Sequence, residues 1–201
     1  MSDVKLAIVY YSATGTVRSM AERLAATGAQ AGAEVRLRQV ERQTSGGEKA
    51  ATDAQQVEAE AGQGTEAVTA DDIVWADAVL FGSPTRYGNI AGQLKLFIDS
   101  LGAQWGQGLL ADKVYAGFTS SQTLHGGQET TLLALYNTIY HFGGIIVPPG
   151  YTDGSKFVDG NPYGVSHVTG GGNDIPLGDT EFTALDHLVN RVVGTARKLK
   201  G

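Results

Sequence analysis

The sequence contains no cysteine, and basic residues are fewer than acidic ones. Without cysteine, disulfide bonds, thiol redox chemistry and iron–sulfur ligation are excluded, so any electron transfer must use a bound cofactor. Lys and Arg total 15 against 21 Asp and Glu, a net charge of −6. That balance argues against binding to nucleic acid, which needs a basic face. The four histidines are scattered without metal-ligand spacing, so no metal site is expected.

Long apolar runs are also lacking. No stretch approaches the length of a membrane span, and the first residues carry no signal-peptide pattern, so we expect a cytoplasmic protein without a membrane span. At 201 residues and 42% hydrophobic content, the chain suits one packed α/β domain over 1–201. Segment 41–70 is poor in large apolar residues and is expected to be a solvated, partly mobile insertion. Further loop insertions are expected at 102–112 and 150–178.

Apolar runs typical of buried strands alternate with stretches of helical periodicity. The expected strands are 4–10, 34–40, 76–81, 114–119 and 144–147. The expected helices are 17–31, 90–101 and 128–142, and a last helix capped by Asp179 or Thr180 with Phe182, Leu185, Val189, Val192, Val193 and Ala196 facing inward. This alternation predicts a doubly wound parallel sheet with helices on both faces.

The turn after the first strand is rich in hydroxyl groups. Ser12, Thr14 and Thr16 can each donate a hydrogen bond, and Gly15 permits close approach of the backbone. The helix that follows presents unpaired N–H groups at its positive end. The turn has no lysine and fits neither GxxxxGK[ST] nor GxGxxG, which argues against a nucleoside triphosphate or a dinucleotide. A neutral cradle of hydroxyls suits the single terminal phosphate of flavin mononucleotide (FMN), although hydroxyls at such a position can also simply cap the helix.

Two further polar turns, 82–89 and 120–127, follow the third and fourth expected strands. Parallel strands end at the same edge of a sheet, and ligands bind at that edge where the strand order reverses. The three turns are therefore expected to form one site.

Several motifs taken together resemble the WrbA family, whose members are flavodoxin-like NAD(P)H:quinone oxidoreductases first named tryptophan-repressor-binding proteins. The motifs are FGSPTRYGN (81–89), QLKLFID (93–99), GAQWGQG (102–108), HGGQE (125–129), IYHFGGIIVPPGY (139–151) and NPYGVSHVTGG (161–171). Ser12-x-Thr14-Gly15, at the end of the first strand, resembles the phosphate loop of flavodoxins. The resemblance covers nearly the whole chain apart from 41–70. It implies a flavodoxin-like five-stranded sheet of order 2-1-3-4-5.

The resemblance also implies noncovalent FMN, NADH or NADPH as electron donor, a quinone substrate and ping-pong transfer of two electrons. The expected assembly is a homotetramer, with a dimer as the alternative, whose active sites combine residues of neighbouring subunits. The cofactor-binding residues it implies are Ser12, Ala13, Thr14, Gly15, Thr16 and Val17, then Pro84, Thr85, Arg86, Tyr87, Gly88 and Asn89, then Ser120, Ser121, Gln122, Thr123, Leu124, His125 and Gly126, and His141.

His141 is the implied catalytic residue, a hydrogen-bond donor toward the quinone oxygen, and Trp105, Tyr87 and Thr14 are the implied substrate contacts. Plainer interpretations also exist: His141 as a helix cap, Arg86 as a surface ion-pair partner and Tyr87 as a surface aromatic. The family usually has Tyr-Gly-His where this chain has Thr14-Gly15-Thr16, which moves the turn toward ordinary flavodoxins and removes an aromatic contact to nicotinamide. This departure favours one alternative function, a flavodoxin-type one-electron carrier. A second alternative, a non-catalytic partner of a transcription repressor, comes only from the first name of the family.

Overall fold

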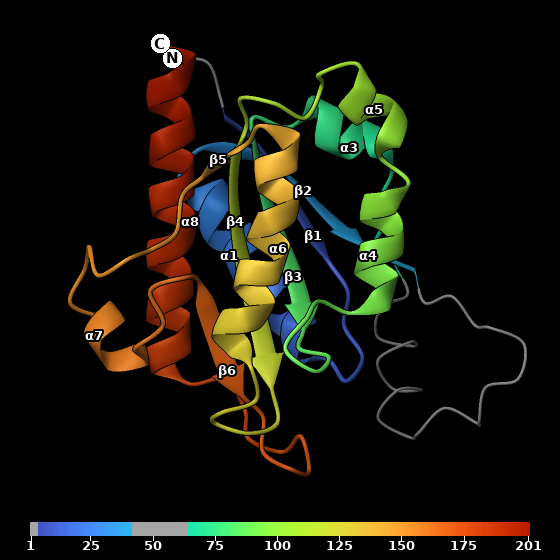
Figure 1. Ribbon diagram of the computed structural model, residues 1–201. Helices are drawn as coiled ribbons and strands as arrows, with labels where there is room; N and C mark the ends of the chain where they lie inside the picture. The colour runs from blue at the N-terminus through green and yellow to red at the C-terminus, as the bar shows by residue number, and fades with distance from the viewer. Residues whose placement is uncertain (1–3, 42–63) are drawn as a thin grey trace, which may run out of the picture.

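The computed structural model describes residues 4–41 and 64–201, and these residues build a parallel sheet between two layers of helices (Figure 1). The strands on the main path are β1 (Val4–Tyr10), β2 (Ala33–Gln39), β3 (Ala78–Pro84), β4 (Val114–Ser121) and β5 (Ile145–Ile146). Their spatial order is β2-β1-β3-β4-β5, and every pair is parallel. This confirms the predicted fold class and strand order.

Seven helices are described, and they lie on both faces of the sheet. They are α1 (Thr16–Gln30), α3 (Ala70–Trp75), α4 (Gly92–Asp99), α5 (Gly102–Gly106), α6 (Gln128–Phe142), α7 (Lys156–Asp159) and α8 (Asp179–Lys200). Helices α1 and α8 pack on one face, whereas α3, α4 and α6 pack on the other (Figure 1).

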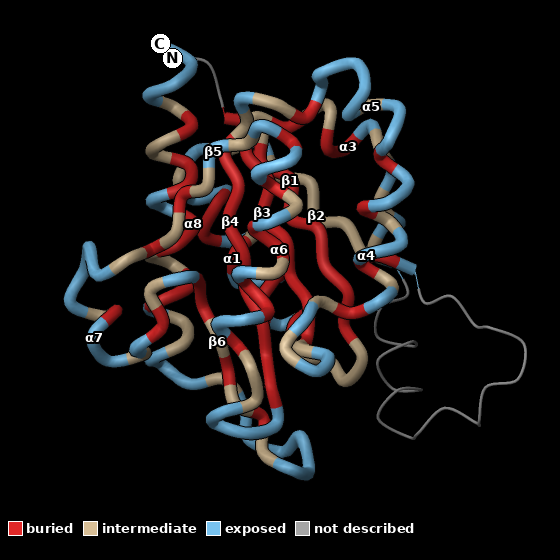
Figure 2. The backbone as a smooth tube through the Cα atoms, viewed as in Figure 1, coloured by how far each residue is buried: buried red, intermediate tan, exposed pale blue. Residues whose placement is uncertain are grey.

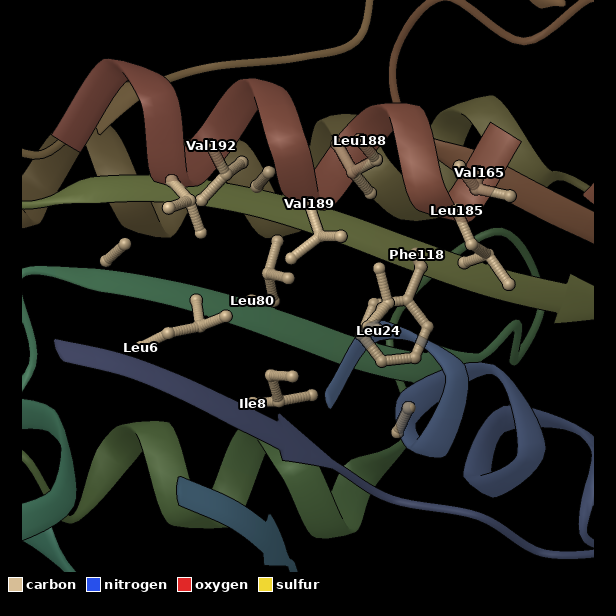
Figure 3. Close-up of a cluster of buried hydrophobic side chains, with 14 of the residues drawn as sticks. Leu6, Ile8, Leu24, Leu80, Phe118, Val165, Leu185, Leu188, Val189 and Val192 are labelled. Carbon is tan, nitrogen blue, oxygen red and sulfur yellow. The ribbon is translucent and has the colours of Figure 1, made fainter. Parts of the chain in front are cut away.

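Alternation along the strands explains why both faces are covered. In β1, Leu6 and Ile8 point toward α1 and α8, whereas Ala7 and Val9 point toward α4 and α6. Figure 3 shows the first of these cores, where Leu188 and Val192 of α8 lie over the strands. Full burial of such a side chain contributes roughly 1.5–3 kcal/mol, so these two cores are the main source of stability.

The fifth strand position is split between two short segments. β5 pairs with Val114 and Tyr115 of β4, and β6 (Val165–Val168) pairs with Phe118–Ser121 farther along. Because β3 occupies the other edge of β4, β5 and β6 follow one another along the same edge. The prediction of a long loop over 150–178 was therefore wrong, since that stretch contains α7 and β6. A four-residue strand next to Gly164 has too little sequence signal of its own and depends on pairing with β4.

Other boundaries also differ from the predictions. β3 continues through Gly82–Pro84, which we had expected in the turn, because Pro84 is in register with Ser120 of β4. Helix α5 lies inside the expected loop 102–112, and α3 begins at the last residue of segment 41–70, of which 42–63 lie outside the described residues. The last helix is capped at Gly178, not at Asp179 or Thr180: the Glu181 carboxylate accepts a hydrogen bond from the Gly178 N–H at 3.0 Å.

Candidate functional site

A cavity of about 550 Å³ opens where β1, β3 and β4 end, which is the expected edge of the sheet. This volume lies within the range of small-molecule sites. Figure 2 shows β1, β3 and β4 buried, and the turns at their ends largely exposed or half-buried. The lining residues are Ala13, Thr14, Pro84, Thr85, Arg86, Tyr87, Ser120, Ser121, Gln122, Thr123, Gly126, Thr169 and Asn173. Eleven of these thirteen were predicted as cofactor-binding.

The first turn leaves the start of α1 open toward solvent. Gly15 precedes the helix with a φ of 96°, and no side chain of the described residues caps it. The first turn of α1 carries no acidic residue, so no carboxylate competes for its N–H groups. The Ser12 hydroxyl accepts a hydrogen bond from the Gly15 N–H at 3.1 Å, which fixes the turn. Thr14, Gly15 and Thr16 also line a second hollow, of about 450 Å³, beside the cavity.

The second turn is closed by its own backbone. Arg86 and Asn89 exchange main-chain hydrogen bonds of 2.7 and 3.0 Å. Between them, Tyr87 has a φ of 54°, a left-handed conformation that is uncommon for a residue with a side chain. Its side chain is fully exposed at 103% of its reference area, although it lines the cavity. The ring is therefore free to stack on a flat molecule held there.

The second and third turns are held against each other. The Thr85 hydroxyl donates to the carbonyl of Gly126 at 3.2 Å and accepts from the Thr131 hydroxyl at 2.8 Å. Gly127 has a φ of 85°, and a Cβ placed on it would lie 2.9 Å from the Cα of Gly88. Glycine at 127 thus lets the two turns approach closely, which fixes the geometry of the cavity.

Two lining residues, Thr169 and Asn173, were missed by the prediction. They follow β6, and the Thr169 N–H donates to the carbonyl of Ser121 at 2.8 Å. The motif 161–171 belongs to the family resemblance, but its sequence pattern predicts no strand that would bring it to this edge. Had the fifth strand been predicted in two parts, the second part would end at the same edge of the sheet as β4. The residues after it, Thr169 and Asn173, would then have been predicted in the site.

The remaining predicted site residues lie outside the cavity lining. Gly88 and Asn89 complete the second turn, Leu124 and His125 are exposed on the third, and Val17 is buried in the core.

His141 and Trp105 lie together at the other end of α6. The indole N–H of Trp105 donates to the carbonyl of His141 at 2.7 Å, and both line a separate hollow of about 310 Å³. Residue 141 is thirteen residues beyond the start of α6, or about 20 Å along the helix axis. His141 and Trp105 therefore lie away from the cavity between the three turns of their own chain.

The donor set of the cavity fits FMN. Hydroxyls of threonine and serine, main-chain N–H groups and one arginine surround it, and the open start of α1 lies beside it. Such an arrangement receives one phosphate without a lysine and leaves room for a flat ring near Tyr87. Within 4–41 and 64–201, no group of three or more metal-binding side chains gathers, and no helix is long and apolar enough to cross a membrane.

Comparisons with known proteins agree with this geometry. The model of the NADPH-dependent FMN reductase family matches residues 4–157. A protein of Deinococcus radiodurans called NAD(P)H dehydrogenase (quinone) is 45% identical over 201 residues, covering 100% of this chain and 99% of its own. A protein of the same name from Sinorhizobium fredii is 37% identical, covering 97% of this chain and 98% of its own.

Among solved structures, a WrbA-like flavodoxin from Agrobacterium tumefaciens superposes with a TM-score of 0.68. The two sequences are 23% identical, and the match covers 98% of this chain and 99% of the Agrobacterium protein. At this identity the similarity shows the fold alone. The family match extends from β1 into α7 and includes the first three turns of the cavity. The chain therefore belongs to the NADPH-dependent FMN reductase family.

Proposed function

We propose that the protein reduces quinones by two electrons, with FMN as cofactor and NADH or NADPH as donor, in a ping-pong reaction. The observation that carries this proposal is the cavity at the sheet edge, lined by hydroxyl groups and one arginine, with the open start of α1 beside it. The family match supports FMN, and the names of the two relatives support NAD(P)H and a quinone.

The first turn, 12–17, would hold the phosphate of FMN through the hydroxyls of Thr14 and Thr16 and the first N–H groups of α1. The second and third turns would hold the flavin ring and the side chain that links it to the phosphate. The residues involved would be Thr85–Tyr87 and Ser121–Gly126. When bound, FMN would supply the redox chemistry that takes up a hydride from NAD(P)H and reduces a quinone with two electrons and two protons, one of them from solvent. The protein itself provides position, shielding and hydrogen bonds.

Tyr87 would select flat substrates by stacking, because its exposed ring borders the cavity. Nicotinamide and quinone would use this one open side in turn, so the first product must leave before the second substrate enters. No nucleophilic side chain is needed for either half of the reaction.

His141 and Trp105 would act on the site of a neighbouring subunit within a homotetramer. Their hydrogen bond joins α5 to the end of α6, so the pair is presented as one unit, and both side chains are exposed. In a neighbouring site, His141 would donate a hydrogen bond to the quinone oxygen as negative charge develops there. We place this assembly of single-domain subunits in the cytoplasm.

Steady-state kinetics with both substrates varied tests the proposed function. With NADPH and benzoquinone, double-reciprocal plots are expected to give parallel lines, because the two substrates never occupy the site together. Intersecting lines would reject the shared-site scheme, and no turnover with either NADH or NADPH would reject the function.

A further inference from the structure

Of the thirteen described residues that line the cavity, Arg86 alone is charged. The others contribute hydroxyl groups, amides, apolar groups and main-chain atoms. Arg86 lies on the second turn, whereas the phosphate of FMN is assigned to the hydroxyls of the first turn and the start of α1. Its positive charge is therefore left for a different anionic group.

The guanidinium of Arg86 keeps most of its hydrogen-bond donors for a ligand. Arg86 is exposed, and its Nη1 donates to the carbonyl of Thr85 at 3.0 Å. Within residues 4–41 and 64–201, no carboxylate forms an ion pair with this guanidinium. A guanidinium has five N–H donors in a planar fork, which matches two oxygens of a phosphate group.

The backbone that carries this side chain is fixed. The Arg86 N–H donates to the carbonyl of Asn89 at 2.7 Å, and the Asn89 N–H donates to the carbonyl of Arg86 at 3.0 Å. The Thr85 hydroxyl ties the same turn to the carbonyl of Gly126. A ligand that binds the guanidinium therefore has to order the side chain alone, which limits the entropy cost.

The next residue, Tyr87, indicates which anion comes within reach. Its exposed ring borders the cavity, where we expect it to stack on the nicotinamide of the donor. In both NADH and NADPH, the pyrophosphate is separated from the nicotinamide by one ribose. The additional phosphate of NADPH lies farther away, on the adenosine. Because Arg86 adjoins Tyr87, the pyrophosphate is the nearer group.

The hollow beside the first turn has the opposite charge. Of the ten described residues that line it, Asp174 alone is charged, and it is exposed. The whole chain carries a net charge of −6, so an anionic donor is repelled at long range. The phosphates of the donor are thus disfavoured beside Asp174 and favoured beside Arg86.

We propose that Arg86 binds the pyrophosphate of the electron donor and thereby favours a nicotinamide dinucleotide over an uncharged dihydronicotinamide. The inference rests on the proposed function, because it places the flavin ring and the nicotinamide beside Tyr87. Quinones carry no phosphate, so Arg86 makes this contact only while the donor is bound. NADH and NADPH gain equally from it, since both contain the pyrophosphate.

The test compares three donors in the reduction of the reconstituted protein, followed by stopped-flow absorbance without oxygen. The donors are NADH, NADPH and N-benzyl-1,4-dihydronicotinamide, which has the same reacting ring and no phosphate. The readout is the second-order rate constant of each dinucleotide divided by that of the uncharged donor. FMN dissociation constants, measured by quenching of flavin fluorescence on apoprotein, set the FMN concentration that saturates each variant.

Arg86→Gln removes the charge and keeps a polar side chain on the exposed turn. It is expected to lower the ratios for NADH and NADPH about tenfold each, the effect of losing a hydrogen bond to a charged group. Arg86→Lys keeps the charge without the planar fork, and its ratios are expected to fall between those of Arg86→Gln and the unaltered chain.

Arg191→Gln is the matched control. Arg191 is an exposed arginine of α8 whose Nε donates to the carbonyl of Pro148 at 2.9 Å, and it is not among the residues lining the cavity. Its substitution changes the net charge by the same amount as Arg86→Gln, and it should keep the ratios of the unaltered chain.

Unchanged ratios in Arg86→Gln would overturn the inference, and so would an equal fall in Arg191→Gln. A ratio that falls for NADPH and not for NADH would overturn it too, because the pyrophosphate is common to both. These outcomes leave the proposed function standing. An unaltered chain whose flavin neither NADH nor NADPH reduces would overturn the proposed function and this inference with it.

Discussion

Thr14 lies where the cavity meets the hollow beside α1, and it lines both. Its hydroxyl is therefore placed to donate to a phosphate held there. Thr14→Val removes the hydroxyl and keeps the shape of the side chain. We expect the FMN dissociation constant to rise about tenfold, because a hydrogen bond to a charged group is lost, with unfolding free energy unchanged within about 0.5 kcal/mol.

The matched control is Thr183→Val, since the Thr183 hydroxyl donates to its own helix at Asp179 and lies away from the cavity. Equal FMN affinity for Thr14→Val and Thr183→Val, measured by the same fluorescence titration, would remove Thr14 from the phosphate site.

A substitution at Gly127 tests the contact between the second and third turns. Gly127→Ala adds a Cβ 2.9 Å from the Cα of Gly88, at a positive φ that alanine rarely adopts. We expect a loss of about 1–3 kcal/mol in unfolding free energy, measured by urea denaturation, together with weaker FMN binding. Gly154→Ala is the control, since no atom lies within 4 Å of its added Cβ. A Gly127 variant as stable as the Gly154 variant would contradict the close approach.

The residues of the three turns could be predicted because each directly follows a long apolar strand. Thr169 and Asn173 could not, because β6 has four residues and owes its place to pairing with β4. Tyr87 was expected at the site, but its left-handed backbone was not, since nothing in its residue type favours that conformation.

At the scale of elements, α3 shows how a short helix is fixed by one carboxylate. Oδ2 of Asp72 accepts from the N–H and the hydroxyl of Thr69, each at 3.0 Å. Oδ1 accepts from Arg36 at 3.1 Å and from Arg38 at 3.0 Å, which ties α3 to β2. Burial acts to raise the pKa of Asp72, but these bonds outweigh it and lower the pKa below its ordinary value of 3.8.

A carboxyl group whose pKa is lower in the folded than in the unfolded chain stabilises the fold at pH values above its pKa in the unfolded chain. That stability is lost as pH falls through the folded pKa. Asp72→Asn is therefore expected to reduce the free energy of unfolding by about 2 kcal/mol at neutral pH. The difference from the unaltered chain should shrink as pH falls below about 4.

Urea denaturation at a series of pH values measures this difference. Asp71→Asn is the control, because Asp71 is exposed in the same first turn of α3. A deficit of Asp72→Asn that stays constant down to about pH 2 would show that the carboxylate charge is not the cause.

The long elements could be predicted from periodicity, and so could the short strand β5, whereas the short helices could not. β1, β4 and α6 are each at least seven residues long and carry their own apolar pattern. α3, α5 and α7 have four to six residues and depend on contacts made elsewhere, such as the arginines of β2 that hold Asp72. Isolated segments of that length are too short to form stable helices.

At the scale of the whole molecule, the separation of His141 from the cavity gives the proposed assembly a direct test. If His141 serves the site of a neighbour, His141→Ala subunits still bind FMN and lack the donor toward the quinone. Subunits with Thr14→Val and Thr16→Val keep His141 but bind FMN poorly. Mixing the two is expected to restore quinone reductase activity above the sum of the separate variants.

Subunits must exchange for the mixture to respond, so both variants are unfolded and refolded together, and light scattering checks that tetramers form. Activity of the mixed tetramers equal to the sum of the separate variants would contradict a shared site. A monomeric protein that reduces quinones at full rate would also contradict it.

Two-electron transfer from NAD(P)H through bound FMN to a quinone is measured most directly by titrating the reconstituted protein under anaerobic conditions and following its absorbance. We expect one FMN per chain, complete loss of the flavin absorbance with one equivalent of NADPH, and full recovery with one equivalent of benzoquinone. An apoprotein that takes up no FMN at micromolar concentration, or bound flavin that NADH and NADPH both leave oxidised, would contradict it.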